Sequence, residues 1–260
     1  DVHFFQDVPK HADSGFAMVH LVYLWPTVMK NRFLLFYFLV ICLAWTACKG
    51  NTHSTSTNHE QESGPDTTTT PVDYQNEAQQ YESADRVIWQ KPDLVVQQLG
   101  DVEGKVVADL GAGTGYFSRR MAYKGAKVIA IDIDPKAIQW MEDQKARFPQ
   151  ELRDRLTIRL AEPDDPKLKA NEVDMVLLVN TYSYIQNRVV YFSRLKDAIR
   201  HGGYMVIIDF KKKETPFGPP LEERVDVREV EKELVEAGYT VLTTDESSLD
   251  YQYIIKVRRN

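Results

Sequence analysis

Residues 109–117 read Asp-Leu-Gly-Ala-Gly-Thr-Gly-Tyr-Phe and place glycines at Gly111, Gly113 and Gly115. The stretch begins inside a short apolar run, residues 105–110 (KVVADL), and ends where a helical pattern begins. Glycine adopts backbone conformations that other residues avoid, and it lets a ligand approach the main chain closely. In parallel sheets, ligands bind outside the carboxyl ends of the strands. The stretch therefore predicts a ligand-binding turn between a strand and a helix.

Strand and helix patterns alternate around this turn. The apolar runs predict strands at residues 105–110, 127–131, 155–160, 173–179, 204–210, 239–244 and 251–257. The helical spacing predicts helices at residues 92–99, 116–124, 134–148, 188–200 and 226–238. Such alternation is typical of a parallel sheet that helices cover on both faces.

Two connections in the C-terminal part of the chain complete the prediction of the fold. Gly202 and Gly203 are expected to end the helix over 188–200. The last two strands are joined by a tight turn near Ser247 and Ser248, which is too short for a parallel crossover. We therefore predict an α/β fold: a Rossmann-like, seven-stranded, mainly parallel sheet with one antiparallel strand and helices on both faces.

Asp109 argues against the dinucleotide-binding turn, whose pattern is G-x-G-x-x-G. Here the third glycine, Gly115, comes one position early, and Tyr116 occupies the expected position. A carboxylate two residues before the first glycine would repel a pyrophosphate, whereas it suits an ammonium group or a sulfonium-linked amino acid. An NAD-dependent oxidoreductase is therefore the less favoured alternative.

The glycine-rich turn together with residues 128–135 (VIAIDIDP) resembles the first motifs of class I S-adenosylmethionine-dependent methyltransferases. The resemblance implies that S-adenosyl-L-methionine is the cofactor and that Asp132 accepts hydrogen bonds from both ribose hydroxyls. Asp134 is interpreted as the N-cap of the following helix. The cofactor-binding residues that the resemblance and the turn imply are Asp109, Gly111, Ala112, Gly113, Gly115, Tyr116, Asp132, Ile133, Glu162, Asp164 and Asn180.

Further segments resemble a group of bacterial methyltransferases whose methyl acceptor is unassigned. They are WQKP (89–92), PDDP (163–166), VNTYSYI (179–185), DFKKKETPFGPP (209–220) and YQY (251–253). In that group histidines often occupy the positions of Ser183 and Tyr184, and this chain has none there. The expected acceptor is a small molecule, and the candidates for its pocket, besides Tyr116, are Trp89, Lys91, Tyr182, Lys211 and Tyr251. A non-catalytic cofactor-binding module on the same scaffold is the alternative.

Composition narrows the chemistry further. The formal net charge is −6, which argues against a nucleic-acid partner. Cys42 and Cys48 precede the expected domain, and His201 is its single histidine, so we predict no metal site and no thiol nucleophile. No catalytic base is predicted, because a sulfonium cofactor supplies the electrophile and the protein mainly positions the acceptor.

The N-terminal part is organised differently from the domain. Residues 29–48 combine a charged start with a short apolar run and end in Thr-Ala-Cys, which resembles a bacterial lipoprotein signal with Cys48 as the lipidated residue. An uncleaved membrane anchor is the alternative. We interpret residues 1–28 as a non-native upstream extension, 49–80 as a disordered polar tether and 81–260 as the methyltransferase domain. The expected location is the membrane surface, with the domain exported to the periplasm or cell exterior.

Overall fold

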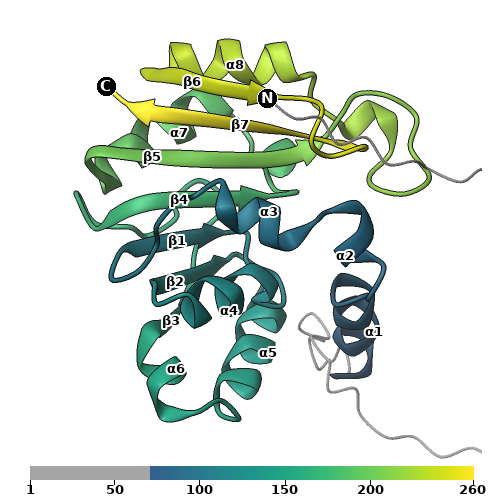
Figure 1. Ribbon diagram of the computed structural model, residues 1–260, viewed down its shortest axis with the longest axis vertical. Helices are drawn as coiled ribbons and strands as arrows, with labels where there is room; N and C mark the ends of the chain where they lie inside the picture. The colour runs from purple at the N-terminus through teal and green to yellow at the C-terminus, as the bar shows by residue number, and fades with distance from the viewer. Residues whose placement is uncertain (1–70) are drawn as a thin grey trace, which may run out of the picture. The chain divides into compact units, whose positions relative to one another are not determined.

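The computed structural model describes residues 71–260, which contain a seven-stranded sheet (Figure 1). Its strands are β1 (Val106–Leu110), β2 (Lys127–Asp132), β3 (Leu156–Leu160), β4 (Val173–Val179), β5 (Ile199–Phe210), β6 (Tyr239–Asp245) and β7 (Gln252–Arg259). The strand order is β3-β2-β1-β4-β5-β7-β6. Strands β1 to β5 pair in parallel, whereas β7 runs antiparallel to both β5 and β6. The prediction of a mainly parallel sheet with one reversed strand is confirmed.

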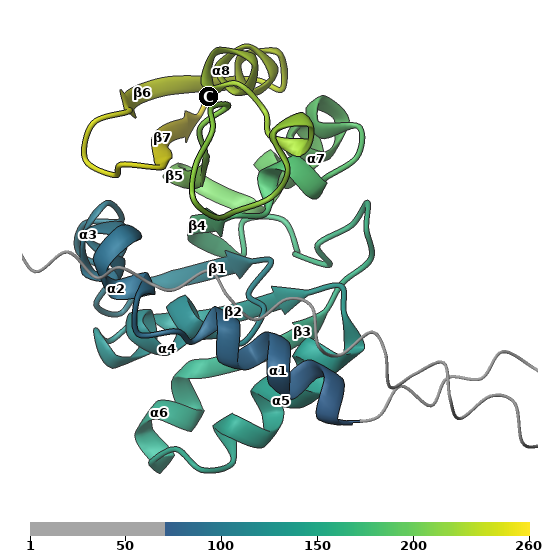
Figure 2. The same cartoon turned by 90° about the vertical axis from the view of Figure 1, so that its right-hand side faces the viewer.

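Helices cover both faces of the sheet (Figure 2). One apolar core joins the sheet to α7 (Arg188–Ala198) and α8 (Val227–Glu236), and it includes Phe192 and Leu234. The other core joins the opposite face to α3 (Pro92–Gln97), α4 (Tyr116–Tyr123), α5 (Pro135–Lys145) and α6 (Gln150–Arg155). Residues of β4 such as Val176 and Leu177 contribute to these two cores in turn, because successive side chains of a strand point to opposite faces.

Side-chain caps position two of the helices. Asp134 accepts a hydrogen bond from the backbone N–H of Lys136 at 2.9 Å, and Pro135 occupies the first helical position of α5. Asp226 accepts one from the backbone N–H of Arg228 at 3.0 Å. Both aspartates therefore satisfy backbone donors that the helix itself leaves unpaired, and the N-cap role predicted for Asp134 is confirmed.

The glycine pair near residue 202 does not end helix α7, which corrects the prediction. The helix ends at Ala198, and Gly202 and Gly203 lie inside β5. A Cβ on Gly203 would stand 2.5 Å from the carbonyl oxygen of Asp174, so β5 passes β4 too closely there for any side chain. The pairing of β4 with β5 shifts register at the same place, so the glycines serve an irregular strand.

The domain also begins before residue 81. Residues 71–80, which the sequence assigns to the polar tether, form most of α1 (Pro71–Tyr81). Tyr74 and Ala78 are buried against Ala137 and Trp140 of α5, and these contacts attach a mainly polar segment to the domain. A further short helix, α2 (Arg86–Trp89), follows.

Several sequence predictions lie outside the described residues. They are the upstream extension at 1–28, the signal segment at 29–48 with Cys48, and the tether over 49–70. Within residues 71–260, no helix is both long and apolar enough to cross a membrane. The same part of the chain contains no cluster of three or more histidine, cysteine or acidic side chains that could hold a metal ion.

Candidate cofactor site

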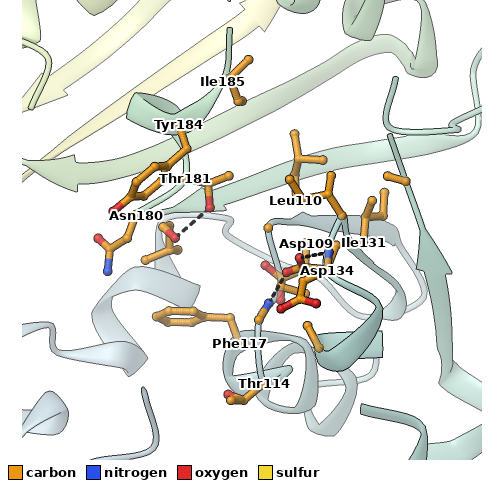
Figure 3. Close-up of a pocket in the computed structure, with 18 of the residues that line it drawn as sticks. Asp109, Leu110, Thr114, Phe117, Ile131, Asp134, Asn180, Thr181, Tyr184 and Ile185 are labelled. Carbon is orange, nitrogen blue, oxygen red and sulfur yellow. Dashed lines mark hydrogen bonds between the residues drawn. The ribbon is translucent and has the colours of Figure 1, made fainter. Parts of the chain in front are cut away.

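A cavity of about 350 Å³ opens at the carboxyl ends of β1, β2 and β4 (Figure 3). The glycine-rich turn after β1 forms one wall, and the acidic turn after β2 forms the next. Thr181 and Tyr184, from the segment after β4, lie across from them. The volume is that of a small-molecule site, and its position is where open α/β sheets bind ligands.

The glycine-rich turn is held tightly against its neighbours. The backbone N–H groups of Gly111 and Ala112 both donate to the carbonyl oxygen of Ile131 at 2.9 Å. Gly111 has a φ of +75°, and a Cβ placed on it would come closer than 3.0 Å to side-chain atoms of Thr181. Gly113 also has a positive φ, of +55°, but a Cβ there would meet no atom within 4 Å. Gly111 is thus required by packing, whereas Gly113 leaves open space beside the cavity.

Asp109 lies at the end of β1 and is almost completely buried. Its Oδ2 accepts a hydrogen bond from the Ser118 hydroxyl at 2.6 Å. Burial raises the pKa of Asp109 to about 6, although the Ser118 hydrogen bonds and the positive charge of Arg86 oppose the rise. A cationic ligand group near this carboxyl would favour its charged form. The site therefore suits the ammonium group of an amino-acid ligand.

Asp132, at the end of β2, connects the two loops that border the cavity. Its Oδ2 accepts a hydrogen bond from the Gly113 N–H at 2.7 Å, and its Oδ1 accepts one from the Asp134 N–H at 3.0 Å. A carboxylate oxygen can accept more than one hydrogen bond, so both remain able to bind hydroxyl groups. The ribose contact stays a prediction, and the structure adds a second role for Asp132 in fixing the loops.

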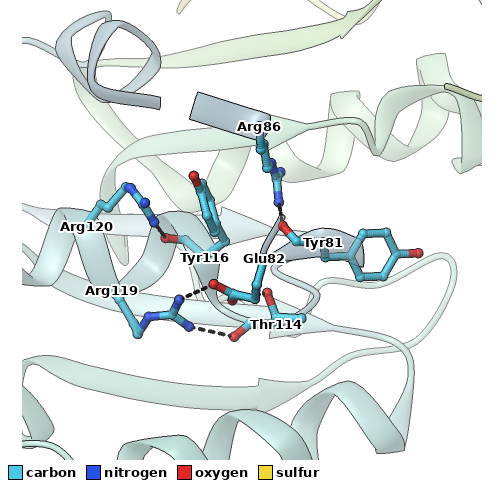
Figure 4. A network of polar contacts seen from close by, with 7 residues as sticks. All are labelled: Tyr81, Glu82, Arg86, Thr114, Tyr116, Arg119 and Arg120. Carbon is cyan, nitrogen blue, oxygen red and sulfur yellow. Dashed lines mark hydrogen bonds and ion pairs between the residues drawn. The ribbon is translucent and has the colours of Figure 1, made fainter. Parts of the chain in front are cut away.

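Residues 71–90 form a cover over the cavity, which we call the N-terminal cover. Tyr74, Tyr81 and Arg86 from this segment line the cavity. Glu82 accepts hydrogen bonds from the Thr114 hydroxyl and from Arg119 Nη2, both at 2.7 Å (Figure 4). These Glu82 hydrogen bonds therefore attach the cover to the glycine-rich turn and to the start of α4.

Tyr116 adds a second attachment for the cover. Its ring lies between the guanidinium groups of Arg86, 4.3 Å from the ring centroid, and Arg120, at 3.6 Å. Both distances fall within the range of cation–π attraction. Burial lowers the pKa of Arg86 to about 10, which leaves the guanidinium charged at neutral pH. The sequence does not predict the cover as a unit, because the residues of it that line the cavity belong to no motif and the segment is largely polar.

Most of the predicted cofactor residues meet at the cavity. Those that line it are Asp109, Gly111, Ala112, Gly113, Tyr116, Asp132, Ile133, Glu162 and Asn180. Gly115 and Asp164 do not. Gly115 caps α4 with a φ of +76° and lies against Met141, while Asp164 is exposed in the loop after β3.

The five acceptor-pocket candidates other than Tyr116 do not line this cavity. Trp89 and Tyr251 both contact Phe217, with ring centroids 4.7 Å and 5.0 Å apart, in an aromatic cluster of their own. Lys91 donates to the Ser248 carbonyl oxygen at 2.8 Å, and Lys211 donates to that of Leu249 at 2.7 Å. These lysines thus fix the loop between β6 and β7, and an acceptor role for the four residues stays a prediction.

Tyr182 is a core residue in this structure and does not line the cavity, so its acceptor role stays a prediction. Its side chain is fully buried, its ring stacks on Phe192, and its hydroxyl donates to Glu233 at 2.6 Å. Burial raises the pKa of the hydroxyl well above its usual value. The short 3₁₀ helix η1 (Tyr182–Tyr184) turns Tyr182 inward, and Tyr184, which is 61% exposed, lines the cavity instead.

The fold and the cavity define a Rossmann-like protein with a small-molecule site at the carboxyl ends of its parallel strands. Residues 108–207 match the family model described as a methyltransferase domain. The demethylmenaquinone methyltransferase of Tropheryma whipplei (strain Twist) is 31% identical over 114 residues, which cover 44% of this chain and 45% of that protein. The magnesium-protoporphyrin O-methyltransferase of Rhodobacter capsulatus is 34% identical over 84 residues, or 32% of this chain and 35% of that protein.

Solved structures show the same architecture. The crystal structure of an S-adenosylmethionine-dependent methyltransferase from Aquifex aeolicus superposes with a TM-score of 0.64 at 24% identity, over 72% of this chain and 97% of that one. Residues 108–207 thus match a methyltransferase domain, and the described residues have the fold of that S-adenosylmethionine-dependent methyltransferase. The chain spans less than half the length of these two curated relatives, so their substrates do not pass to it directly.

Proposed function

We propose that the protein transfers the methyl group of S-adenosylmethionine to a small-molecule acceptor. The observation that carries the proposal is the convergence of Asp109, Gly111 and Asp132 on one cavity within the matched domain. Each fits one part of the cofactor: a buried carboxyl for the ammonium, a side-chain-free turn for close approach, and a second carboxylate for the ribose hydroxyls. The same residues fit NAD poorly, because Asp109 would face a pyrophosphate.

The chain's part in the reaction is to bind, orient and exclude water. When bound, the cofactor supplies a methyl group on a sulfonium, which an acceptor attacks in line. The N-terminal cover encloses the cavity from one side, and Tyr184 lies at its exposed edge. No histidine lines the cavity in the described residues, so the acceptor would have to be a nucleophile that needs no histidine base.

A small-molecule acceptor is supported by the modest cavity and by the formal net charge of −6, which disfavours nucleic acid. The two curated relatives are also named as methyltransferases of demethylmenaquinone and of magnesium-protoporphyrin. Their matches span less than half of each protein, so the acceptor itself has to be found by experiment.

Two measurements test the proposal. Titration calorimetry of a chain that begins at residue 65 should detect S-adenosylhomocysteine and no NAD. Incubation with methyl-labelled S-adenosylmethionine and a cell extract should then transfer label to the small-molecule fraction. Label in protein or RNA would overturn the acceptor class, while binding without any transfer would favour the non-catalytic module. Binding of NAD alone would overturn the cofactor.

We also propose that Cys48 is lipidated and attaches the protein to a membrane. Residues 29–48, a charged start followed by a short apolar run and Thr-Ala-Cys, support this location. Mass spectrometry of the membrane fraction should find no peptide N-terminal to Cys48, and Cys48→Ser should leave the longer precursor. Recovery of residues 29–47 on the wild-type protein would favour the uncleaved anchor.

A further inference from the structure

A chain of side-chain hydrogen bonds connects the N-terminal cover to the cavity through the reversed strand β7. Arg86 Nε donates to Gln90 Oε1, Gln90 Nε2 donates to Gln252 Oε1 at 3.1 Å, and Gln252 Nε2 donates to Asn180 Oδ1. Gln90 and Gln252 are completely buried. The residues come from α2 and its end, from β7 and from the end of β4, so the chain brings together three distant parts of the sequence.

The donor and acceptor roles along this series of hydrogen bonds are determined at its Arg86 end. A guanidinium group has only donors, so Gln90 must turn its oxygen toward Arg86 and its amide nitrogen toward Gln252. Gln252 must then turn its own oxygen toward Gln90 and its nitrogen toward Asn180. A reversed amide would place donor against donor in a buried position, which is strongly unfavourable. The orientation of the Asn180 carboxamide therefore follows from the charge on Arg86.

Asn180 is held rigidly in that orientation. Its backbone N–H donates to the carbonyl oxygen of Ile208 at 2.9 Å, and its φ of +57° is one that asparagine tolerates better than most residues. Its Oδ1 is occupied by Gln252, whereas its Nδ2 makes no hydrogen bond to the described residues. Because Asn180 lines the cavity, the group that it can offer to a ligand is a donor.

The charges around the cavity indicate what that donor meets. Asp109 and Arg86 both line it, and their charges are close enough to interact. An acidic and a basic group on one cavity fit an amino acid, whose ammonium lies toward the acid and whose carboxylate lies toward the base. The Asn180 Nδ2 group is a donor like Arg86, so it can pair with the carboxylate of such a ligand but not with its ammonium group.

We propose that Gln90 and Gln252 are positioning residues that keep the Asn180 Nδ2 group directed at the carboxylate of the cofactor's amino-acid end. The proposal rests on the proposed cofactor, and it gives strand β7 a part in recognition of that cofactor. Gln252 acts through Asn180 and does not itself line the cavity.

The test compares two ligands that differ at this end. S-adenosylhomocysteine carries the carboxylate, whereas 5′-methylthioadenosine has the same nucleoside and no amino-acid group. Gln252→Glu keeps the size of the side chain but offers only acceptors, so the Asn180 carboxamide has to turn its nitrogen away from the cavity. We expect the affinity for S-adenosylhomocysteine to fall about tenfold and that for 5′-methylthioadenosine to change by less than about twofold.

Two further variants separate this role from a general disturbance. Asn180→Asp keeps the acceptor for Gln252 and removes the donor, so it should cause the same selective loss even if Gln252→Glu folds poorly. In an Asn180→Ala background, Gln252→Glu should cost no further affinity, because a positioning residue acts only through its partner. Gln97→Glu, the same change at an exposed site on α3, is the matched control and should leave both affinities unchanged.

The outcomes are distinct. An equal loss for both ligands would overturn the proposal, since it would show a collapse of the cavity. Unchanged affinity for both in Gln252→Glu and Asn180→Asp would overturn it as well. Failure of the wild-type protein to bind either ligand would instead overturn the proposed function.

Discussion

Thr181 packs so closely on Gly111 that a Cβ on the glycine would come within 3.0 Å of side-chain atoms of the threonine. This contact joins the turn after β1 to the segment after β4. Gly111 also has a φ of +75°, which disfavours any side chain independently of the space. The glycine pattern of the turn therefore combines two separate requirements.

Replacement of Gly111 tests the tighter of these requirements. Gly111→Ala should lower the free energy of unfolding by about 2–4 kcal/mol, from the left-handed backbone and from overpacking against Thr181. Gly113→Ala is the matched control, because its φ is +55° but its Cβ would meet no atom within 4 Å. Its cost should stay near about 1 kcal/mol. Urea denaturation of both variants measures the difference, and equal losses would show that packing on Thr181 is unimportant.

Asp132 should affect both ligand binding and stability, because it bonds to the Gly113 and Asp134 backbones. Asp132→Ala is expected to weaken S-adenosylhomocysteine binding at least about tenfold. The free energy of unfolding should also fall by about 1–3 kcal/mol. Asp226→Ala removes a similar bond, to the Arg228 N–H, far from the cavity. It should destabilise the protein by about 1 kcal/mol without loss of affinity; equal affinity in both variants would place the ribose elsewhere.

The sequence predicted the parts of the protein that depend on local patterns. Apolar runs such as residues 173–179 gave β4 with its bounds, and the glycine-rich turn with Asp132 gave the cavity wall. Tyr182 and Tyr184 show the limit of this approach. They are two residues apart in a turn of 3₁₀ helix, and only the path of the backbone determines that one is buried and the other exposed.

Residues 71–80 of the N-terminal cover are not predicted as part of the domain for a related reason. Helix α1 is mainly polar and is held by a few contacts, above all those of Tyr74 and Ala78 with α5. Glu82 is hydrogen-bonded to residues more than thirty positions away in the sequence, and Arg86 reaches Asn180 only through two glutamines. A local sequence pattern therefore cannot reveal the roles of these two residues. Likewise, Gln252 acquires its partners only when β7 inserts between β5 and β6.

Asp109 should make the stability of the ligand-free protein depend on pH. Its pKa is about 6 in the folded protein, against 3.8 as the reference value, so the folded state binds more protons between these values. The free energy of unfolding should therefore fall as pH rises from about 4 to about 6, by a contribution on the order of 2 kcal/mol. Asp109→Asn, which carries no charge, should show a smaller fall when urea denaturation is compared at pH 4.5 and pH 7.

Two details keep this prediction specific. Burial also raises the pKa of Asp209 to about 6, so the wild-type change contains both groups and only the difference from Asp109→Asn belongs to Asp109. A cationic ligand group beside Asp109 would favour the ionised form, so S-adenosylhomocysteine should bind more tightly at pH 7 than at pH 5. An identical pH dependence of stability in Asp109→Asn and the wild type would contradict the assignment.

The hydrogen bonds of Glu82 should control how quickly a ligand leaves the cavity. Glu82 holds the N-terminal cover by accepting from Thr114 and Arg119, and the Arg119–Glu82 pair is only partly exposed, at 21% and 29%. Glu82→Gln keeps the size but removes the charge, so the cover should open more often. We expect the dissociation rate of S-adenosylhomocysteine to rise about three- to tenfold, with a loss of unfolding free energy of about 1 kcal/mol. Stopped-flow displacement by excess unlabelled ligand measures the rate.

Glu151→Gln removes the exposed Arg155–Glu151 pair on α6 and should leave the rate unchanged. If Glu82→Gln also released ligand at the wild-type rate, the cover would not limit exit, and its contacts with Thr114 and Arg119 would serve stability alone.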